Sequence, residues 1–162
     1  MTIFTRIDDR LIHGQVVEGW VNFLKATSIF VADDKVASNA LQRSIMEISV
    51  PQGLRVFIGG VQDICGRIRS SVSETGCAIL LFSNPVDVLR ALKTGLICPL
   101  INVGGMHYIP GKRRLMDVLA VDDADMNALK EILSRGVKIE IQTVPTAKPL
   151  PLEKIFEACS LT

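Results

Sequence analysis

The sequence lacks the features that mark nucleic-acid, nucleotide and zinc-binding proteins. Aromatic residues make up only 5% of its 162 residues, so no platform for stacking single-stranded bases is evident. The 18 basic and 17 acidic residues leave a net charge of +1, without the basic stripe of a DNA-binding protein. Neither G-x-x-x-x-G-K-S/T nor G-x-G-x-x-G occurs, which argues against nucleotide binding. The two histidines and the scattered cysteines do not suit a zinc site.

Long apolar runs are also missing. No run approaches the roughly 20 residues of a membrane-spanning helix. The N-terminal M-T-I-F-T-R-I-D-D lacks the basic segment and apolar core of a signal peptide. The four cysteines have no C-x-x-C spacing and are expected to be buried thiols: Cys65, Cys77, Cys98 and Cys159. The longest basic run, Lys112 to Arg114, is interpreted as a solvated loop. We therefore expect a soluble cytoplasmic protein that needs no metal and no cofactor.

Short apolar segments, alternately strand-like and helix-like, fill the chain instead. With 48% hydrophobic residues, this length predicts a single domain over residues 1–162. The predicted strands are Thr2–Ile7, Ser28–Ala32, Leu54–Ile58, Ala78–Phe82, Pro99–Val103 and Val137–Val144. The predicted helices are Gly14–Leu24, Val36–Ile48, Val61–Ser71, Pro85–Lys93, one that Asp122 or Asp123 caps and that ends at Ser134, and Leu152–Cys159. Strands that alternate with helices predict an α/β fold with a largely parallel sheet between helices.

Capping residues and periodicity predict several boundaries. Asp34 is the candidate N-cap of helix 36–48, and Asn84 is the predicted N-cap of the helix that begins at Pro85. Residues 137–144 alternate with period two, which is typical of a half-exposed edge strand. Residues 145–162 are interpreted as a tail, in which a proline-bearing linker (145–151) precedes the short terminal helix.

The segment R-I-D-D-R-L-I-H-G-Q-V-V, from Arg6 to Val17, carries the most informative chemistry. It places His13 at the start of a predicted helix, where unpaired N–H groups and the helix dipole favour an anion such as phosphate. Arg6 and Arg10 add guanidinium donors that suit phosphate oxygens. An imidazole is a good nucleophile near neutral pH and can carry a covalent group. The segment predicts either a phosphoryl-accepting histidine or a helix-capping histidine beside surface ion pairs.

This segment resembles the phosphorylation-site signature of the IIB components of the mannose/fructose/sorbose family in the bacterial sugar phosphotransferase system. V-A-D-D-K-V-A (31–37) resembles the end of the family's second strand, I-N-V-G-G-M-H-Y (101–108) its glycine loop, and G-V-K-I-E-I-Q-T-V-P (136–145) its last strand. These markers run in family order over nearly the whole chain. One departure is Asp33, where asparagine is more often expected; it leaves the phosphoryl chemistry intact but bears on which partner docks.

The resemblance implies a single-domain three-layer α/β/α fold with a central, largely parallel mixed sheet flanked by helices. Its first strand is then central and neighbours the strand that ends at Val103. Because a functional crevice in such sheets lies beyond the carboxyl ends of the strands, loops 8–13 and 104–108 would lie side by side there. Gly104 and Gly105 would let the backbone approach a phosphate closely.

The resemblance also implies roles for individual residues. His13 is the expected phosphohistidine intermediate, with Nδ1 as the attacking atom, and Arg10 is the expected catalytic partner. The residues expected to bind or support the phosphate are Arg6, Asp9, Gly14, Gln15, Gly104 and Gly105.

Each of these roles has a structural alternative. Arg6 is equally well explained as the partner of an aspartate, Arg10 as one half of a pair with Asp8 or Asp9, and Gln15 as a helix cap. Because both aspartates cannot face a phosphate without repulsion, at least one should orient an arginine or the imidazole. His107, on the glycine loop, is expected to be hydrogen-bonded for structure.

The implied function is a phosphoryl relay. A phosphohistidine on a IIA protein or domain would donate its phosphoryl group to His13, which would pass it to a sugar presented by membrane IIC and IID components. Leu11 and Ile12, if exposed, would form an apolar rim that seats the partner and excludes water. The protein would be cytoplasmic and peripherally associated with the membrane transporter; the resemblance leaves the sugar and the existence of a homodimer open.

Two other classes of protein would also carry a phosphoryl group. A two-component receiver domain would need an aspartate at the end of the third strand, but that strand ends in Phe57-Ile58-Gly59-Gly60. A phosphorylated signalling module that regulates partners, without phosphorylating sugar, is not separated from a transport subunit by the His13 motif.

Overall fold

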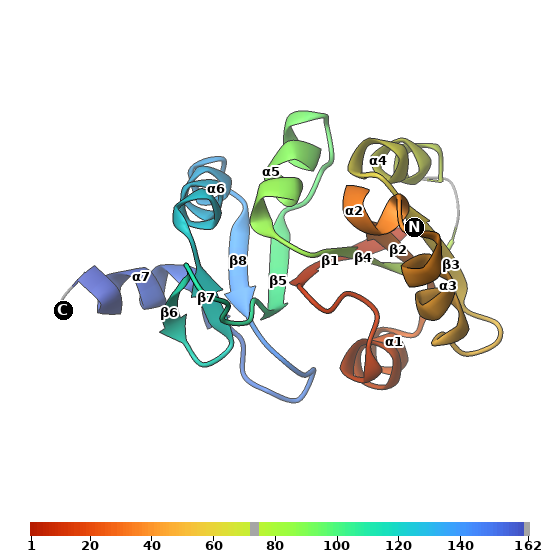
Figure 1. Cartoon of the computed structure of the whole chain (residues 1–162), viewed down its shortest axis with the longest axis horizontal. Helices are drawn as coiled ribbons and strands as arrows, with labels where there is room; N and C mark the ends of the chain where they lie inside the picture. Colours follow the sequence, from red (N-terminus) through yellow and green to blue (C-terminus); the bar gives the residue numbers. More distant parts are fainter. Residues whose placement is uncertain (72–74, 161–162) are drawn as a thin grey trace.

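The computed structural model describes residues 1–71 and 75–160, which form a three-layer α/β/α fold (Figure 1). Within these residues a seven-stranded sheet has the order β3-β2-β4-β1-β5-β8-β9. Its strands are β1 (Thr2–Asp8), β2 (Ala26–Ala32), β3 (Arg55–Gly59), β4 (Cys77–Phe82), β5 (Leu100–Gly105), β8 (Lys138–Ile141) and β9 (Leu150–Pro151). Five pairings are parallel and only β9 is antiparallel to its neighbour, which confirms the largely parallel mixed sheet. As implied, β1 is central and pairs with β5.

Helices cover both faces of this sheet (Figure 1). One face carries the π-helix η1 (Gln15–Trp20), α1 (Val21–Leu24), α2 (Asp34–Ala37) and α3 (Ala40–Ile48). The other carries α4 (Val61–Ser70), α5 (Pro85–Lys93) and α6 (Asp123–Ser134). The last helix, α7 (Leu152–Ser160), packs beside β8 and β9. No helix in the described part of the chain is long and apolar enough to cross a membrane.

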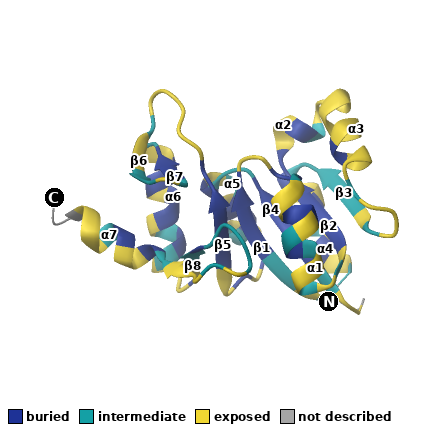
Figure 2. Cartoon of the chain, turned by 90° about the horizontal axis from the view of Figure 1, so that it is seen from below, coloured by how far each residue is buried: buried dark blue, intermediate teal, exposed yellow. Residues whose placement is uncertain are grey.

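The core consists of two apolar layers separated by the sheet. In β4 the side chains of Ala78, Leu80 and Phe82 pack in one layer, and those of Ile79 and Leu81 pack in the other. This alternation follows from the period of two in a strand, and burial on both faces explains why the strand is continuously apolar. Figure 2 shows the central strands as buried, whereas α3 and the loop before β6 are exposed.

The predicted helix 36–48 is wrong as one element, because the chain forms two helices there. Asp33, and not Asp34, caps α2 by accepting the Val36 N–H at 2.9 Å, and Asn39 caps α3 by accepting the Gln42 N–H at 3.0 Å. Asp34 is the first residue of α2, and its carboxylate instead accepts the N–H of Val61 at 2.9 Å, at the start of α4. The two N-caps lie within seven residues of each other and divide the segment into two helices, although its apolar periodicity is continuous.

The predicted edge strand 137–144 is also shorter and less exposed than expected. β8 ends at Ile141, and β9 pairs with it, so β8 is not the edge of the sheet. β9 lies inside the predicted linker 145–151, where Pro151 can occupy an edge because it donates no N–H to a neighbour.

Residues 106–121 contain a hairpin that was not predicted from the sequence. β6 (Arg113–Met116) and β7 (Leu119–Val121) pair in an antiparallel arrangement, so the run 112–114 is not simply a solvated loop, although Arg113 and Arg114 are exposed. Of the four cysteines, Cys65 and Cys98 are buried as predicted, Cys77 is partly buried and Cys159 is exposed.

Candidate functional site

The candidate site is organised by Asp8, the last residue of β1. Its side chain is fully buried, at the point where the register between β1 and β5 shifts and Asp8 faces Gly105. One carboxylate oxygen, Oδ2, accepts from Arg6 Nη2 at 3.0 Å and lies 3.0 Å from His13 Nε2. The other, Oδ1, lies 3.4 Å from Arg10 Nε and 3.3 Å from the Arg10 backbone nitrogen. One carboxylate therefore holds all three basic side chains of the motif.

The electrostatic environment keeps this carboxylate ionised. Burial by itself raises the pKa of Asp8, but the hydrogen bond with His13 and the charges of His13, Arg6 and Arg10 outweigh burial and hold the pKa below its ordinary value. Burial likewise lowers the pKa of Arg6, and the contact with Asp8 opposes that shift. Asp8 and Arg6 thus depend on each other as a buried ion pair.

A left-handed residue turns the loop back toward Asp8. Leu11 has a φ of 55°, rare for a leucine, and its N–H donates to the Asp8 carbonyl at 2.9 Å. Leu11 and Ile12 are both buried in the apolar layer beneath η1, so the exposure on which the apolar rim depended is not met. The two side chains anchor the loop in the core, and this places Arg10 and His13 on either side of Asp8.

The imidazole of His13 has its two nitrogens in different surroundings. Nε2 faces the Asp8 carboxylate, which can only accept, so Nε2 carries the hydrogen. In the neutral ring, the lone pair is then on Nδ1, which is the nucleophilic nitrogen. The side chain is 15% exposed, and the His13 carbonyl accepts the N–H groups of Val16 and Val17, both at 3.0 Å. The carboxylate therefore fixes both the tautomer and the direction of the ring.

Arg10 and Gln15 flank His13 on the exposed side. The Arg10 side chain is 42% exposed and donates through Nη2 to Gln15 Oε1 at 3.2 Å. Gly14 precedes η1 with helical dihedral angles, and a Cβ there would meet only open space. An exposed guanidinium, an amide and a helix start therefore lie together around His13, on the solvent side of Asp8.

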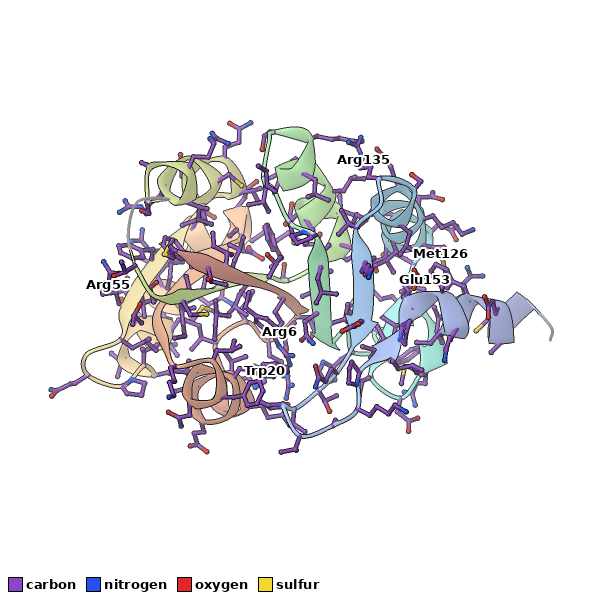
Figure 3. All side chains as sticks on the ribbon, turned by 180° about the vertical axis from the view of Figure 1, so that it is seen from behind. Arg6, Trp20, Arg55, Met126, Arg135 and Glu153 are labelled. Atoms are coloured by element: carbon purple, nitrogen blue, oxygen red, sulfur yellow. The ribbon has the colours of Figure 1, made fainter. Side chains whose placement is uncertain are left out.

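Arg6 lies on the opposite, interior side of Asp8. Its guanidinium donates to the Asn102 side chain and, at 3.0 and 3.1 Å, to the carbonyls of Gln142 and Thr143. It also lies over the ring of Trp20, 5.1 Å from the ring centre, and Figure 3 labels both residues. Because the whole side chain is buried, Arg6 acts on the site through Asp8.

Gly104 makes room for this arginine. A Cβ on Gly104 would overlap the guanidinium of Arg6, so the absence of a side chain makes room for the buried ion pair. Arg6 fills the space where the Gly104 side chain would lie, and a close approach of a phosphate to the Gly104 backbone stays a prediction. Sequence reasoning did not foresee this use, nor the contacts of Asn102 and Trp20 with Arg6, because nothing in the local pattern shows which neighbour a glycine accommodates.

Asp9 holds His107. Its two carboxylate oxygens contact the His107 backbone N–H and ring Nδ1, each at 2.6 Å, and its own N–H donates to the Gly105 carbonyl at 3.0 Å. Gly105 lies under the ring, because a Cβ there would stand 3.0 Å from His107 Cε1. The two loops are thus side by side, as predicted, and His107 is hydrogen-bonded as expected.

The assembled site has a nucleophilic nitrogen, an exposed guanidinium and a buried anchoring ion pair. Such an arrangement can form a covalent bond through His13 Nδ1 and stabilise an anion attached to it. Within the described residues, no group of three or more His, Cys, Asp or Glu side chains could hold a metal ion.

Comparison with known proteins agrees with this chemistry. Residues 2–161 match the family model of the PTS system sorbose subfamily IIB component. The N-acetylgalactosamine-specific phosphotransferase enzyme IIB component 2 of Escherichia coli K12 is 35% identical over 154 residues, which are 95% of this chain and 98% of that protein. The mannose-specific EIIAB component of the same organism is 33% identical over 148 residues, 91% of this chain and 46% of its own length. The crystal structure of the IIBSor domain of the Klebsiella pneumoniae sorbose permease superposes with a TM-score of 0.91 at 29% identity, covering 98% of both chains.

Proposed function

Because this chain belongs to the sorbose subfamily of IIB components of the phosphotransferase system, we propose that it carries a phosphoryl group on His13 between a IIA protein and a sugar. The observation that supports this most strongly is the contact of His13 Nε2 with the buried carboxylate of Asp8, 3.0 Å away. That contact leaves Nδ1 as the nucleophile. A helix-capping histidine would need no such fixed tautomer.

Loading of His13 would proceed by in-line displacement. The lone pair of His13 Nδ1 attacks the phosphorus of a phosphohistidine on the donor, a P–N bond forms on His13, and the donor's P–N bond breaks. Asp8 stabilises the ring as its positive charge grows, because the Nε2 hydrogen bond becomes charge-assisted. Reactions of this kind depend mainly on positioning and on charge stabilisation, which the fixed ring supplies.

Arg10 would stabilise the transferring group. Its guanidinium is exposed beside His13, is held by Asp8 and Gln15, and presents a planar fork that suits two phosphoryl oxygens. The first N–H groups of the helical segment, at Gly14 and Gln15, would add backbone donors. Arg6 and Asp9 would support the site from behind, through Asp8 and through the neighbouring loop.

The partners follow from this role. The similarity to a protein named as an EIIAB component supports a IIA protein or domain as the phosphoryl donor. Membrane IIC and IID components would present the sugar, and the chain would work in the cytoplasm at their inner surface. Since relatives are named for N-acetylgalactosamine, sorbose, mannose and fructose, these four sugars form the panel to be tested.

The direct test is phosphorylation of the purified chain. Incubation with labelled phosphoenolpyruvate, the two general phosphotransferase proteins and a cognate IIA should give one acid-labile, base-stable phosphate per chain. His13→Ala should abolish the label, and mass spectrometry of the wild type should place it on His13. Label that persists in the variant, or that lies on a cysteine, would refute the proposed carrier residue.

The second half of the relay is tested by discharge. Labelled protein should pass its phosphate to one of the four sugars only when membranes containing its IIC and IID components are added. A labelled protein that never discharges to any of them would contradict the transport role. Discharge to sugar without membranes would require a sugar site on this chain and would contradict the proposal in a different way.

A further inference from the structure

Asp9 and His107 form a second carboxylate–imidazole pair that the loading step does not use. Asp9 approaches His107 with both oxygens, one on the backbone N–H and one on Nδ1, each at 2.6 Å. Two contacts from a single carboxylate, with Gly105 against the ring, fix the position of the imidazole. A histidine needed only to brace a loop would gain little from a fixed ring direction, because the backbone contact alone ties the loop.

The tautomer of His107 is the reverse of that of His13. The Asp9 carboxylate can only accept, so Nδ1 of His107 carries the hydrogen and, in the neutral ring, Nε2 carries the lone pair. The side chain is 47% exposed. His107 thus presents a proton acceptor to the outside, whereas His13 presents Nδ1.

The two imidazoles are hydrogen-bonded to consecutive residues. Asp8, which is buried, holds His13, and Asp9, which is exposed, holds His107. The Asp9 N–H donates to the Gly105 carbonyl, so the loop that carries His107 borders the loop that carries His13. An acceptor molecule seated over His13 would therefore lie against both loops.

We propose that His107 is the general base for discharge of the phosphoryl group to a sugar hydroxyl, an inference that rests on the proposed function. The hydroxyl oxygen forms a bond to phosphorus, the P–N bond to His13 breaks, and its electron pair returns to Nδ1. The hydroxyl proton passes to Nε2 of His107, while Asp9 stabilises the imidazolium that results. The proton then leaves to solvent, which restores the neutral ring.

Loading has no such requirement, and this difference makes the proposal testable. When the phosphoryl group moves from one imidazole nitrogen to another, no hydroxyl is consumed and no proton must be accepted. His107 should therefore matter for discharge and be dispensable for loading. A brace for the loop would instead affect both halves of the relay through the position of the site.

His107→Asn separates the two roles. The amide nitrogen of asparagine is two bonds from Cβ, as Nδ1 is in histidine, so it can still donate to Asp9, but nothing replaces Nε2. We expect loading from the IIA donor at the wild-type rate and discharge to sugar, with membranes added, slowed about ten- to a hundredfold. His107→Gln, whose amide nitrogen replaces Nε2 but cannot accept a proton, should discharge equally slowly.

Further readouts distinguish failure of this inference from failure of the proposed function. The wild type should show a solvent deuterium isotope effect on discharge that His107→Asn reduces, because the proton transfer to Nε2 is then absent. Discharge of His107→Asn at the wild-type rate would overturn the role of His107 while leaving the relay intact. Equal slowing of loading and discharge would assign His107 a bracing role and also overturn it. Absence of label on His13 in the wild type would instead contradict the relay itself.

Discussion

A single carboxylate at the end of β1 determines the geometry of the site. Asp8 links a buried arginine, an exposed arginine and the imidazole of His13, and it does so from a fully buried position. Removal of a partner would leave charge unpaired in the interior, which is far more costly than loss of a surface ion pair. The residue-scale predictions therefore concern Asp8 and the glycine that makes room for its partner.

The lowered pKa of Asp8 predicts how stability depends on pH. A carboxylate whose folded pKa lies below its unfolded value, about 3.9, stabilises the fold fully above that value and loses this contribution as pH falls through the folded pKa. The free energy of unfolding of the wild type should therefore fall toward that of Asp8→Asn as the pH drops below about 4. Urea unfolding of both proteins across this range measures the difference, and a gap that widens toward low pH would contradict the assignment.

Gly104→Ala should destabilise the fold by about 2–3 kcal/mol, because the new methyl group would overlap the guanidinium of Arg6 in a packed interior. Gly66→Ala in α4 is the matched control. Its Cβ would meet only the end of Arg69, at 4.0 Å, and alanine in a helix should stabilise by about 0.5–1 kcal/mol. Chemical denaturation of both variants checks the contrast; equal effects would mean that Arg6 moves aside without cost.

At the scale of elements, the carboxyl ends of neighbouring strands are joined by side chains that cap helices. Asp33, after β2, caps α2 through the Val36 N–H and accepts the Ser83 hydroxyl, after β4, at 2.5 Å. Asp34, next to it, accepts the Val61 N–H at the start of α4 and pairs with Arg90 of α5. Two adjacent carboxylates thus connect α2, the end of β4, the start of α4 and α5, at the edge of the sheet where the site lies.

Asp33→Ala should lower the free energy of unfolding by about 1–2 kcal/mol, because it removes the cap of α2 and the partner of Ser83. Asp33→Asn should change it by less than about 1 kcal/mol, since an amide oxygen can still cap α2 and the amide nitrogen can donate to Ser83. Thermal unfolding of the two variants measures the effects. A loss with asparagine as large as with alanine would show that the charge, and not the hydrogen bonding, is what matters.

The sequence predicted elements well where one local rule acted alone. The buried runs 28–32 and 78–82 became strands because apolar period and length agreed, and Asn84 with Pro85 gave the start of α5 correctly. The break between α2 and α3 was missed because two caps compete with helical periodicity, and the outcome depends on tertiary contacts of Asp33. β9 and the β6–β7 hairpin were missed because short strands exist only through their pairing.

The candidate site shows the same division. The grouping of His13 and Arg10 at a helix start, and the meeting of loops 8–13 and 104–108, could be predicted from the motif and from sheet topology. The pairing of each aspartate with its histidine could not be predicted. The sequence does not show which of two adjacent carboxylates is buried, and only the packed loop does. The burial of Leu11 and Ile12 follows from a left-handed turn that no periodicity reveals.

For the whole molecule, the tail 145–160 is joined to the main body by core packing. Leu152 is fully buried and Ile155 nearly so, both in the apolar layer that also contains Ile7 of the central strand. The single tryptophan, Trp20, lies in the other layer, across the sheet. The two layers share the strands between them, so we propose that residues 1–162 unfold as one domain.

Leu152→Ala should therefore shift the unfolding transition reported by Trp20 fluorescence, although the two residues lie in different layers. Truncation of a fully buried leucine should cost about 2–5 kcal/mol, and far-ultraviolet circular dichroism should give the same midpoint as fluorescence. Lys154→Ala, at an exposed position of α7, is the control and should change stability by less than about 0.5 kcal/mol. An unchanged Trp20 transition in Leu152→Ala would show that the tail unfolds separately.

The pairing of Asp8 and Asp9 with arginine and histidine side chains bears on the free energy of phosphoryl attachment in the proposed carrier. Arg6 and Arg10 are balanced by the two carboxylates, so the resting site is close to electrically neutral. A phosphoryl group on His13, as we propose, would add about two negative charges to that site without meeting a surplus of positive ones. Its attachment would then gain little electrostatic stabilisation, and the P–N bond would keep a high transfer potential. The proposed carrier would exchange its phosphoryl group with the donor at a small free-energy difference, so the concentrations of substrate and product at the two ends of the relay would set the direction of flow.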